Sequence, residues 1–465
     1  MPVFLAVAAV SYSLVQSVVN PALEALREYV HTDRLGVSWV LTAFLLSSAV
    51  LTPVLGRLGD HLGKRRMLVA VMALLAGGSV LAALAHSLPL LIAGRVLQGA
   101  GGAVLPLAFG IVRDLLPRER VGSVVGTIAA ITSVGGAAGV LVTGPIIGHL
   151  GIPWLFWLPA IANAIVAALL LVNVPSHVPH SGGSVDWLAA FLLGAALVLL
   201  LLPLSLGSQW GWGSPRTVGS LVLSAVAAAL WVFVELRSRS PLIDMTVFRL
   251  RPVWTANVVS LLFGVTLYST FGFIPTFLQL PSGNGYGLAE SVTASGLLFL
   301  PVTLTQLVTG TIAGPLARRV PPKALLVLGG LPVVLCFVLL AVAHDAAWQV
   351  VLATAIGGLG FGLSLSALSA IVVHAVPASH TGAATGMNAN IRNIGGAVGA
   401  AAVSSLLAAA PGENGWVIAF AALAVAATLG VLASLLIPSE ASAPSPADVP
   451  AAGWMPRKTR SRGVT

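Results

Sequence analysis

The residues best suited to chemistry lie in one short segment, Gly56–Arg66, which reads G-R-L-G-D-H-L-G-K-R-R. It carries five charged side chains, in a chain where only 8% of residues are charged. Its single carboxylate, Asp60, stands among four cations, a set suited to reversible ion pairing and not to bond cleavage. Apolar runs at 38–55 and 67–85 flank the segment, and each is long enough to cross a bilayer. A basic turn between two spans belongs at the cytoplasmic surface.

No enzyme pattern accompanies this segment. The chain has no G-x-S-x-G, H-E-x-x-H or G-x-x-x-x-G-K-[ST] motif. Without the last of these, an ATP-driven pump is excluded, so we expect no cofactor and an ion or solute gradient as the energy source. The histidines are scattered at span ends, and no metal site is expected from them.

The composition is that of an all-α integral membrane protein. Hydrophobic residues make up 57% of the chain and the mean hydropathy is +0.99, whereas soluble domains have about 45–50% apolar and about 25% charged residues. Long unbroken Leu/Val/Ala runs exclude a β-barrel, whose strands alternate. The net charge of +9 lies mainly in turns, so nucleic acid is not an expected partner, and the lipid bilayer is.

Breaks at Pro, Gly and charge divide the chain into fourteen predicted transmembrane spans. Their centres lie near Val10, Leu46, Leu75, Val104, Ala130, Ile161, Leu197, Ala227, Val265, Thr303, Val334, Ser364, Gly395 and Ala424. With the N-terminus inside, inner turns hold fourteen Lys and Arg residues and outer turns hold three. This asymmetry predicts that both termini are cytoplasmic.

The chain repeats itself at an offset of 260 residues. The matched positions are Pro117, Gly122, Gly126, Gly135, Gly136 and Gly139 with Pro377, Gly382, Gly386, Gly395, Gly396 and Gly399. The repeat predicts two six-helix bundles, 1–174 and 252–437, with two inserted helices in 186–236. The Ala/Pro/Ser-rich tail 438–465 is expected to be disordered, and its basic end to contact anionic lipid.

The pattern of Gly56–Arg66 closely resembles the loop between the second and third helices of major facilitator superfamily transporters. With the repeat and the inserted pair, the chain resembles that superfamily's fourteen-span drug:proton antiporters from Val19 to about Ile437. The resemblance implies two pseudo-symmetric halves, with a substrate site near the midplane between them. It implies proton-coupled efflux of small apolar drug-like or antibiotic-like compounds by alternating access, from a protein expected to be monomeric.

Two other functions stay open. The same fold would serve a facilitator or symporter of a metabolite. A membrane receptor or scaffold that transports nothing is the alternative from another class.

The resemblance gives the charged segment the role of a conformational latch. Asp60 would cap a helix of the other half and pair with Arg113, and this contact would break in the inward-facing state. The latch motif is completed by Gly56, Gly59, Gly63 and Arg65. The simpler alternative is a solvated charge in a loop.

Arg95 and Gln98 match the family's fourth-span motif R-x-x-Q-G. An arginine inside a span is costly and marks function by default. No carboxylate lies within a turn of it on the same helix, so we expect partners on another helix, with backbone carbonyls near Asn20 and Pro21 as candidates. The alternative is that Arg95 extends to the outer interface.

A glycine-rich stretch on the fifth span resembles the family's antiporter motif and predicts close helix packing. Its residues are Gly135, Gly139, Gly144, Pro145 and Gly148. The match is weaker at His149, where the family has another glycine.

A polar set in the second half could line a substrate cavity. Its members are Asn388, Asn390, Arg392 and Asn393 on the thirteenth span, with Asn257, Gln279 and Gln306. Each of them alone is more often an interhelical hydrogen-bonding group.

The chain departs from the family in the first span. Many relatives carry an Asp where this chain has Val15, which is followed by Gln16 and by the segment around Asn20. No acidic residue lies at mid-span, so Glu24 is the nearest candidate for binding the proton. The absence of a buried carboxylate favours neutral or anionic apolar substrates over cations.

Overall fold

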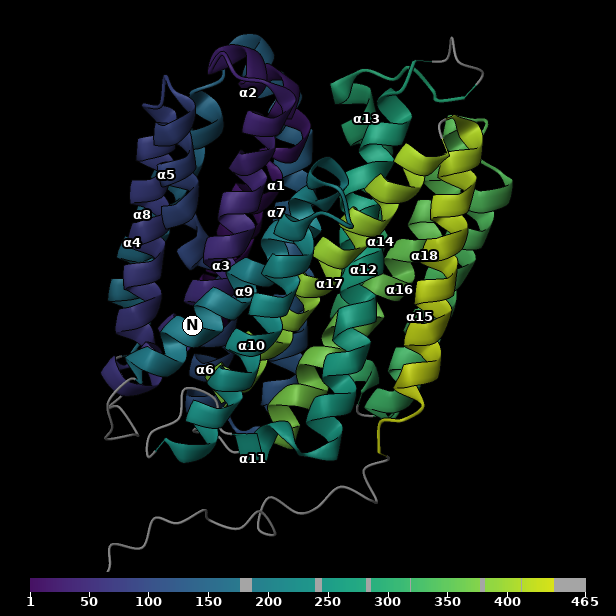
Figure 1. Cartoon of the computed structure of the whole chain (residues 1–465). Coiled ribbons are helices and arrows are strands. Elements are labelled where there is room, and N and C mark those ends of the chain that lie inside the picture. Colours follow the sequence, from purple (N-terminus) through teal and green to yellow (C-terminus); the bar gives the residue numbers. More distant parts are fainter. Residues whose placement is uncertain are drawn as a thin grey trace, which may run out of the picture.

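The computed structural model describes residues 1–175, 186–238, 245–281, 286–317, 319–376, 381–410 and 412–438. All regular elements in these residues are helices (Figure 1). Thirteen of the described helical segments are long and apolar enough to cross a bilayer. The 32-residue helix α7, Arg118–His149, occupies the place of the predicted fifth span, and its described apolar stretch is Ala138–His149. The all-helical membrane class is therefore confirmed.

The helices α1–α8 form what we call the first helix group. They are α1 Pro2–Ser17, α2 Leu23–Tyr29, α3 Arg34–Leu62, α4 Lys64–Ala83, α5 Leu88–Gln98, α6 Val104–Leu115, α7 Arg118–His149 and α8 Trp154–Asn173. Short 3-10 turns interrupt two of the predicted spans, η1 at Asn20–Ala22 and η2 at Gly99–Ala103. The first turn contains Pro21, which cannot donate a backbone hydrogen bond, and the second is rich in glycine.

Two helices follow as a hairpin, α9 Trp187–Trp210 and α10 Pro215–Arg237. Asp186 caps α9, because its side chain accepts a hydrogen bond from the backbone N–H of Ala189 at 3.1 Å. The hydroxyl of Ser238, just beyond α10, donates to the same carboxylate at 2.7 Å. The Ser238 hydrogen bond, followed by the backbone bond from Ala189, lowers the pKa of Asp186. This pair of contacts closes the hairpin, and α9 packs against α3 and against the second group.

The second helix group comprises α12–α18, preceded by the short helix α11, Met245–Phe248. Its members are α12 Arg251–Gln279, α13 Val292–Leu298, α14 Leu300–Leu316, α15 Pro322–Val342, α16 Ala347–Ala375, α17 Thr381–Ala409 and α18 Glu413–Ser434. The predicted unit boundaries 1–174, 186–236 and 252–437 stay predictions. Of the predicted tail, residues 439–465 lie outside the described residues.

The bundle has two distinct ends (Figure 1). One end carries α11 and the junction between α3 and α4, and we call it the basic end because Lys64, Arg65 and Arg66 lie there. The opposite end carries α2 and α13. The basic end is the one that the charge count places in the cytoplasm.

The sequence repeat is also a repeat of helix packing. A Cβ on Gly135 of α7 would overlap the carbonyl oxygen of Val10 on α1. At the matched position, a Cβ on Gly395 of α17 would overlap the carbonyl oxygen of Leu261 on α12. Because only glycine permits such an approach of two backbones, the α1–α7 and α12–α17 pairs are built alike.

Candidate functional site

The charged segment is helical, and the prediction of a loop over Gly56–Arg66 was wrong. Helix α3 continues to Leu62 and α4 begins at Lys64, so Gly63 alone makes the turn. Gly63 has φ of +99°, in the left-handed region that favours glycine. Its N–H still bonds the carbonyl oxygen of Gly59 at 3.0 Å, which keeps the end of α3 hydrogen-bonded.

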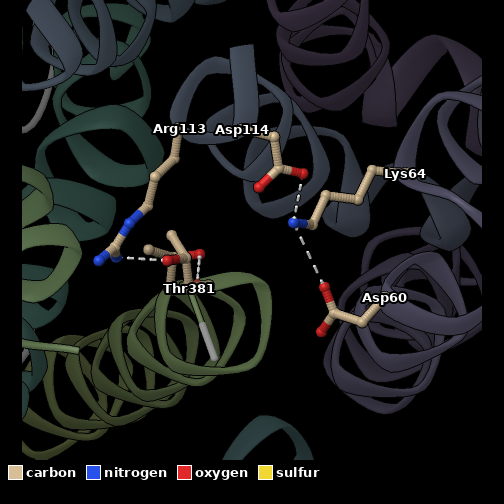
Figure 2. Close-up of polar contacts among 6 residues, drawn as sticks. Asp60, Lys64, Arg113, Asp114 and Thr381 are labelled. Carbon is tan, nitrogen blue, oxygen red and sulfur yellow. Dashed lines mark hydrogen bonds and ion pairs between the residues drawn. The ribbon is translucent and has the colours of Figure 1, made fainter. Parts of the chain in front are cut away.

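A lysine that the sequence reasoning left out of the site organises these charges. The Lys64 Nζ lies 2.7 Å from Asp114 Oδ2 and 3.7 Å from Asp60 Oδ1 (Figure 2). All three side chains are largely buried. The Lys64 stem crosses Gly110, where a Cβ would come within 2.7 Å of it. The close spacing of Asp60 and Lys64 along the chain, on either side of the Gly63 turn, was the sequence signal for this contact.

Arg113 carries the contact between the two helix groups. Its guanidinium donates to the carbonyl oxygens of Val373 and Val376, at the end of α16. It also donates to the hydroxyl of Thr381, the first residue of α17 (Figure 2). The last carbonyls of a helix lack partners within the helix and attract cations, so this site suits an arginine. The direct Asp60–Arg113 pairing that the resemblance implies stays a prediction.

The other latch residues act within the first helix group. Gly56 is buried, and a Cβ on Gly59 would overlap the side chain of Leu107. Arg65 donates to the carbonyl oxygen of Leu171 in the last turn of α8. Arg65 thus ties α4 to α8 within the first helix group.

Arg95 is fully buried, which excludes the alternative that it extends to the interface. Its Nε donates to the carbonyl oxygen of Val40 at 3.1 Å, and its Nη1 to that of Val15 at 3.3 Å. The expected acceptors near Asn20 and Pro21 were wrong by about one helical turn, because the chain there leaves the α-helix for the turn η1. The guanidinium stacks over Phe44, with 4.4 Å from Cζ to the ring centroid.

The Arg95 contacts continue through Gln98 as a buried network. The Gln98 Oε1 accepts from Arg95 Nη1 at 2.7 Å, and its Nε2 donates to Ser79 Oγ at 2.8 Å. Among the described residues, no carboxylate joins this network, and Arg95 Nη2 has no hydrogen-bond partner. Val15, where relatives have an Asp, offers Arg95 only its backbone.

The remaining first-span candidates are placed but not joined to this network. Gln16 and Asn20 are half-buried on α1 and η1. The side chain of Glu24 lies outside the described residues. Its role in binding the proton therefore stays a prediction.

The polar set of the second group is used mainly in hydrogen bonds between helices. Asn388 on α17 donates to Asn257 Oδ1 on α12 at 2.8 Å and accepts from Ser260 Oγ at 3.0 Å. Asn390 instead reaches the first group and donates to the carbonyl oxygen of Ala49 at 2.7 Å. Asn388 and Arg392 line a cavity of about 20 Å³ against Phe109 of α6, which leaves room for about one water molecule.

A much larger cavity, of about 790 Å³, lies at the basic end and was not foreseen. We call it the basic-end cavity. Its walls come from α7, α12, α14, α15, α16 and the end of α18, and most are apolar. Lys323 and His374 are its two basic side chains. Sequence periodicity could not reveal it, since the lining residues come from six helices.

The glycine motif of α7 packs as predicted over most of its length. Beside Gly135, a Cβ on Gly139 would lie 3.0 Å from the carbonyl oxygen of Leu14 on α1. One on Gly144 would lie 2.5 Å from Thr293 Oγ1 on α13. Gly148 has nothing within 4 Å, and Pro145 is exposed, so close packing ends before the helix does.

Comparison with known proteins agrees with this architecture. A family model described as Major Facilitator Superfamily matches residues 5–400 and, in a second match, 285–464. The fold is similar to that of the proton:xylose symporter XylE, with a TM-score of 0.68 at 14% identity over 94% of this chain and 95% of that one. It is also similar to the human organic anion transporter MFSD10, with a TM-score of 0.66 at 16% identity over 94% and 98%.

Curated relatives are similar over most of this chain. The lincomycin resistance protein of Streptomyces lincolnensis is 32% identical over 87% of this chain and 83% of its own length. The tetracenomycin C resistance and export protein of Streptomyces glaucescens is 27% identical over 86% and 74%. An uncharacterized MFS-type transporter of Mycobacterium tuberculosis is 28% identical over 84% of this chain, which spans only 57% of that relative. Because the family model matches most of the chain and a relative is 32% identical over 87% of it, the chain belongs to the Major Facilitator Superfamily.

Proposed function

We propose that this protein exports small apolar compounds across a bacterial plasma membrane by alternating access, driven by a proton gradient. Membership of the superfamily makes it a transporter and not an enzyme. The export direction is supported by relatives named for antibiotic resistance and export. The basic end is the cytoplasmic end in this proposal, with both termini there.

The observation that carries the proposal is the cross-group contact of Arg113. It joins α6 to the adjoining ends of α16 and α17. This contact helps to hold the two groups together at the basic end, so an inward-facing state requires it to break. We also propose, from the family resemblance, that Asp60 belongs to the same latch. Asp60→Asn should then slow transport and leave substrate affinity nearly intact, because the change shifts the balance of states.

The buried charges support neutral or anionic substrates. Arg95 and Arg392 are buried cations in the spans, and Arg95 has no carboxylate partner in the described structure. A lipophilic cation would meet repulsion from them and gain no compensating ion pair. The basic-end cavity, at about 790 Å³, has the size and apolar lining of a drug-sized ligand site. We propose it as the place where substrate first binds from the cytoplasmic side.

The test is accumulation of dye in everted membrane vesicles, whose outer face is the cytoplasmic face, with an imposed pH gradient. Apolar dyes of matched size and neutral, anionic or cationic charge would be compared. We expect accumulation of neutral and anionic dyes that stops when a protonophore collapses the gradient. Accumulation unaffected by the protonophore would reject proton coupling. Substrate movement with its own gradient would favour a facilitator or symporter, and no flux of any dye would favour a receptor or scaffold.

A further inference from the structure

Three potential metal ligands meet at the opposite end of the second helix group. His344 and Asp345 lie in the turn between α15 and α16, and Glu413 is the first residue of α18. One ligand atom from each lies within 4.8 Å of the others. The sequence predicted no metal site, because the histidines are scattered at span ends. Glu413, which joins His344 and Asp345 here, is far from them along the chain.

His344 is a buried imidazole whose ring nitrogens make no hydrogen bond within the described residues, which makes it a candidate ligand for an ion. The residue is 6% exposed, and neither ring nitrogen has a hydrogen-bond partner in the described part of the chain. Its ring packs against Phe277, with centroids 5.6 Å apart, and against Phe420 at 6.1 Å. A buried polar group without a partner is costly, so such groups call for an ion or another ligand.

The geometry fits a cation between imidazole and carboxylate. His344 Nε2 lies 3.5 Å from Glu413 Oε1, too far for a good hydrogen bond. Two ligands held tetrahedrally at about 2.0–2.1 Å from Zn²⁺ lie about 3.3 Å from each other. The ring is fixed by the aromatic side chains, while Asp345 and Glu413 are exposed and free to adjust.

We propose that His344, Asp345 and Glu413 form a Zn²⁺ site, with water as the fourth ligand. One imidazole and two carboxylates are a donor set that Zn²⁺ accepts. The aromatic rings leave Nδ1 without the carboxylate or carbonyl partner that usually strengthens a zinc-bound histidine, so the affinity should be micromolar and not nanomolar.

The site would act as a structural clasp. It would join the α15–α16 turn to the start of α18, all within the second helix group. Since no element of the first group takes part, the metal should stabilise the second group without favouring either transport state. The inference is independent of the proposed substrate and of proton coupling.

The experiment is isothermal titration of the purified full-length chain in detergent with ZnCl2, with Co²⁺ absorption as a report of tetrahedral coordination. We expect one site per chain and a higher Tm with Zn²⁺ present. His344→Gln and Glu413→Gln should each weaken binding at least tenfold and remove the Tm increase. His149→Gln is the matched control, an exposed histidine at the same end, and should bind like the wild type.

Absence of saturable binding to the wild type would overturn the site. So would equal affinity in the wild type and in Glu413→Gln, an exposed substitution that should not prevent folding even if His344→Gln does. A Tm that changes with pH but not with Zn²⁺ would leave only a His344–Glu413 ion pair and would likewise refute the metal.

Discussion

The junction between α3 and α4 and the junction between α14 and α15 occupy matched positions in the repeat, and they use the same backbone plan. Arg65 at the start of α4 donates to the carbonyl oxygen of Leu171 at the end of α8. Lys323 at the start of α15 donates to the carbonyl oxygen of Leu435, the residue directly after α18. In each group a basic residue therefore fastens the third span to the last one.

The residues beside these two hydrogen bonds differ between the groups. In the first group, Lys64 and Asp114 form a buried ion pair. In the second group, Pro322 follows the α14–α15 turn as Lys64 follows the α3–α4 turn, at an offset of 258 residues, and His374 matches Asp114 at the offset of 260. Pro322 and His374 cannot form such a pair, and both line the basic-end cavity. The repeat therefore preserves helix packing, while the polar residues decide whether an ion pair or a cavity lies beside the junction. The first group has the ion pair, which braces its junction, and the second has a cavity with room for a ligand.

The largest effect is expected from substituting Arg95, which lies inside a span. The two groups differ here too, because the residue matched to Arg95 at the offset of 260 is Ala355. Arg95→Ala would leave the carbonyls of Val15 and Val40 without their donor and create a cavity. We expect a loss of about 2–5 kcal/mol in the free energy of unfolding and loss of transport. Arg95→Lys should rescue poorly, because an ammonium does not span these acceptors as a guanidinium does.

The measurement is thermal unfolding together with vesicle efflux. Arg216→Ala, at an exposed arginine of the opposite end, is the control and should behave as the wild type. Full activity in Arg95→Lys would retire the functional interpretation of this arginine.

The second prediction separates the braced junction from the open one. Lys64→Met would remove the ammonium group that lies between the buried carboxylates of Asp60 and Asp114. We expect the free energy of unfolding to fall by about 3 kcal/mol. Lys323→Met removes one hydrogen bond to a carbonyl at an exposed position and should cost less than about 1 kcal/mol. Denaturation of both variants would show the difference, and equal losses would mean that the two junctions are not braced differently.

The third prediction concerns packing, where the two groups should agree. Gly135→Ala and Gly395→Ala each place a methyl group against a facing carbonyl oxygen. We therefore expect each variant to lose about 1–3 kcal/mol in the free energy of unfolding. Gly148→Ala meets nothing within 4 Å and should be neutral or slightly stabilising. Melting temperatures of the three variants test this, and a tolerated Gly395→Ala beside a damaging Gly135→Ala would break the packing symmetry.

The smallest expected effect comes from making the second junction resemble the first. Pro322→Lys combined with His374→Asp would place an ion pair in the basic-end cavity. A double-mutant cycle should show a favourable coupling of about 0.5–1 kcal/mol. Binding of apolar dye should fall as the cavity fills, and unchanged dye binding would show that the cavity is not the first substrate site.

The fold was largely predictable from the sequence, because hydropathy and the glycine repeat act over whole helices. Arg95 was also identifiable, since a charge within a span is rare. Its acceptors were not, because backbone carbonyls carry no sequence signal. The Lys64–Asp114 pair and the basic-end cavity were missed for a related reason: both depend on which residues of separate helices meet. The turn at Gly63 shows that local structure was also hard to predict from the sequence. A run of charged residues between two spans predicts a loop, but here one glycine makes the whole turn and the rest of the run is helical.

The most direct test of the account is whether the Arg113 contact opens during transport. Spin labels at two exposed positions of the basic end, Leu62 on α3 and His374 on α16, would report the distance between the two groups, in a Cys336→Ala background. We predict one short distance in the wild type at rest, and a second, longer one that gains population in Arg113→Gln and during proton-driven turnover. A distribution that stays the same in Arg113→Gln while transport fails would contradict the claim that this arginine holds the basic end closed.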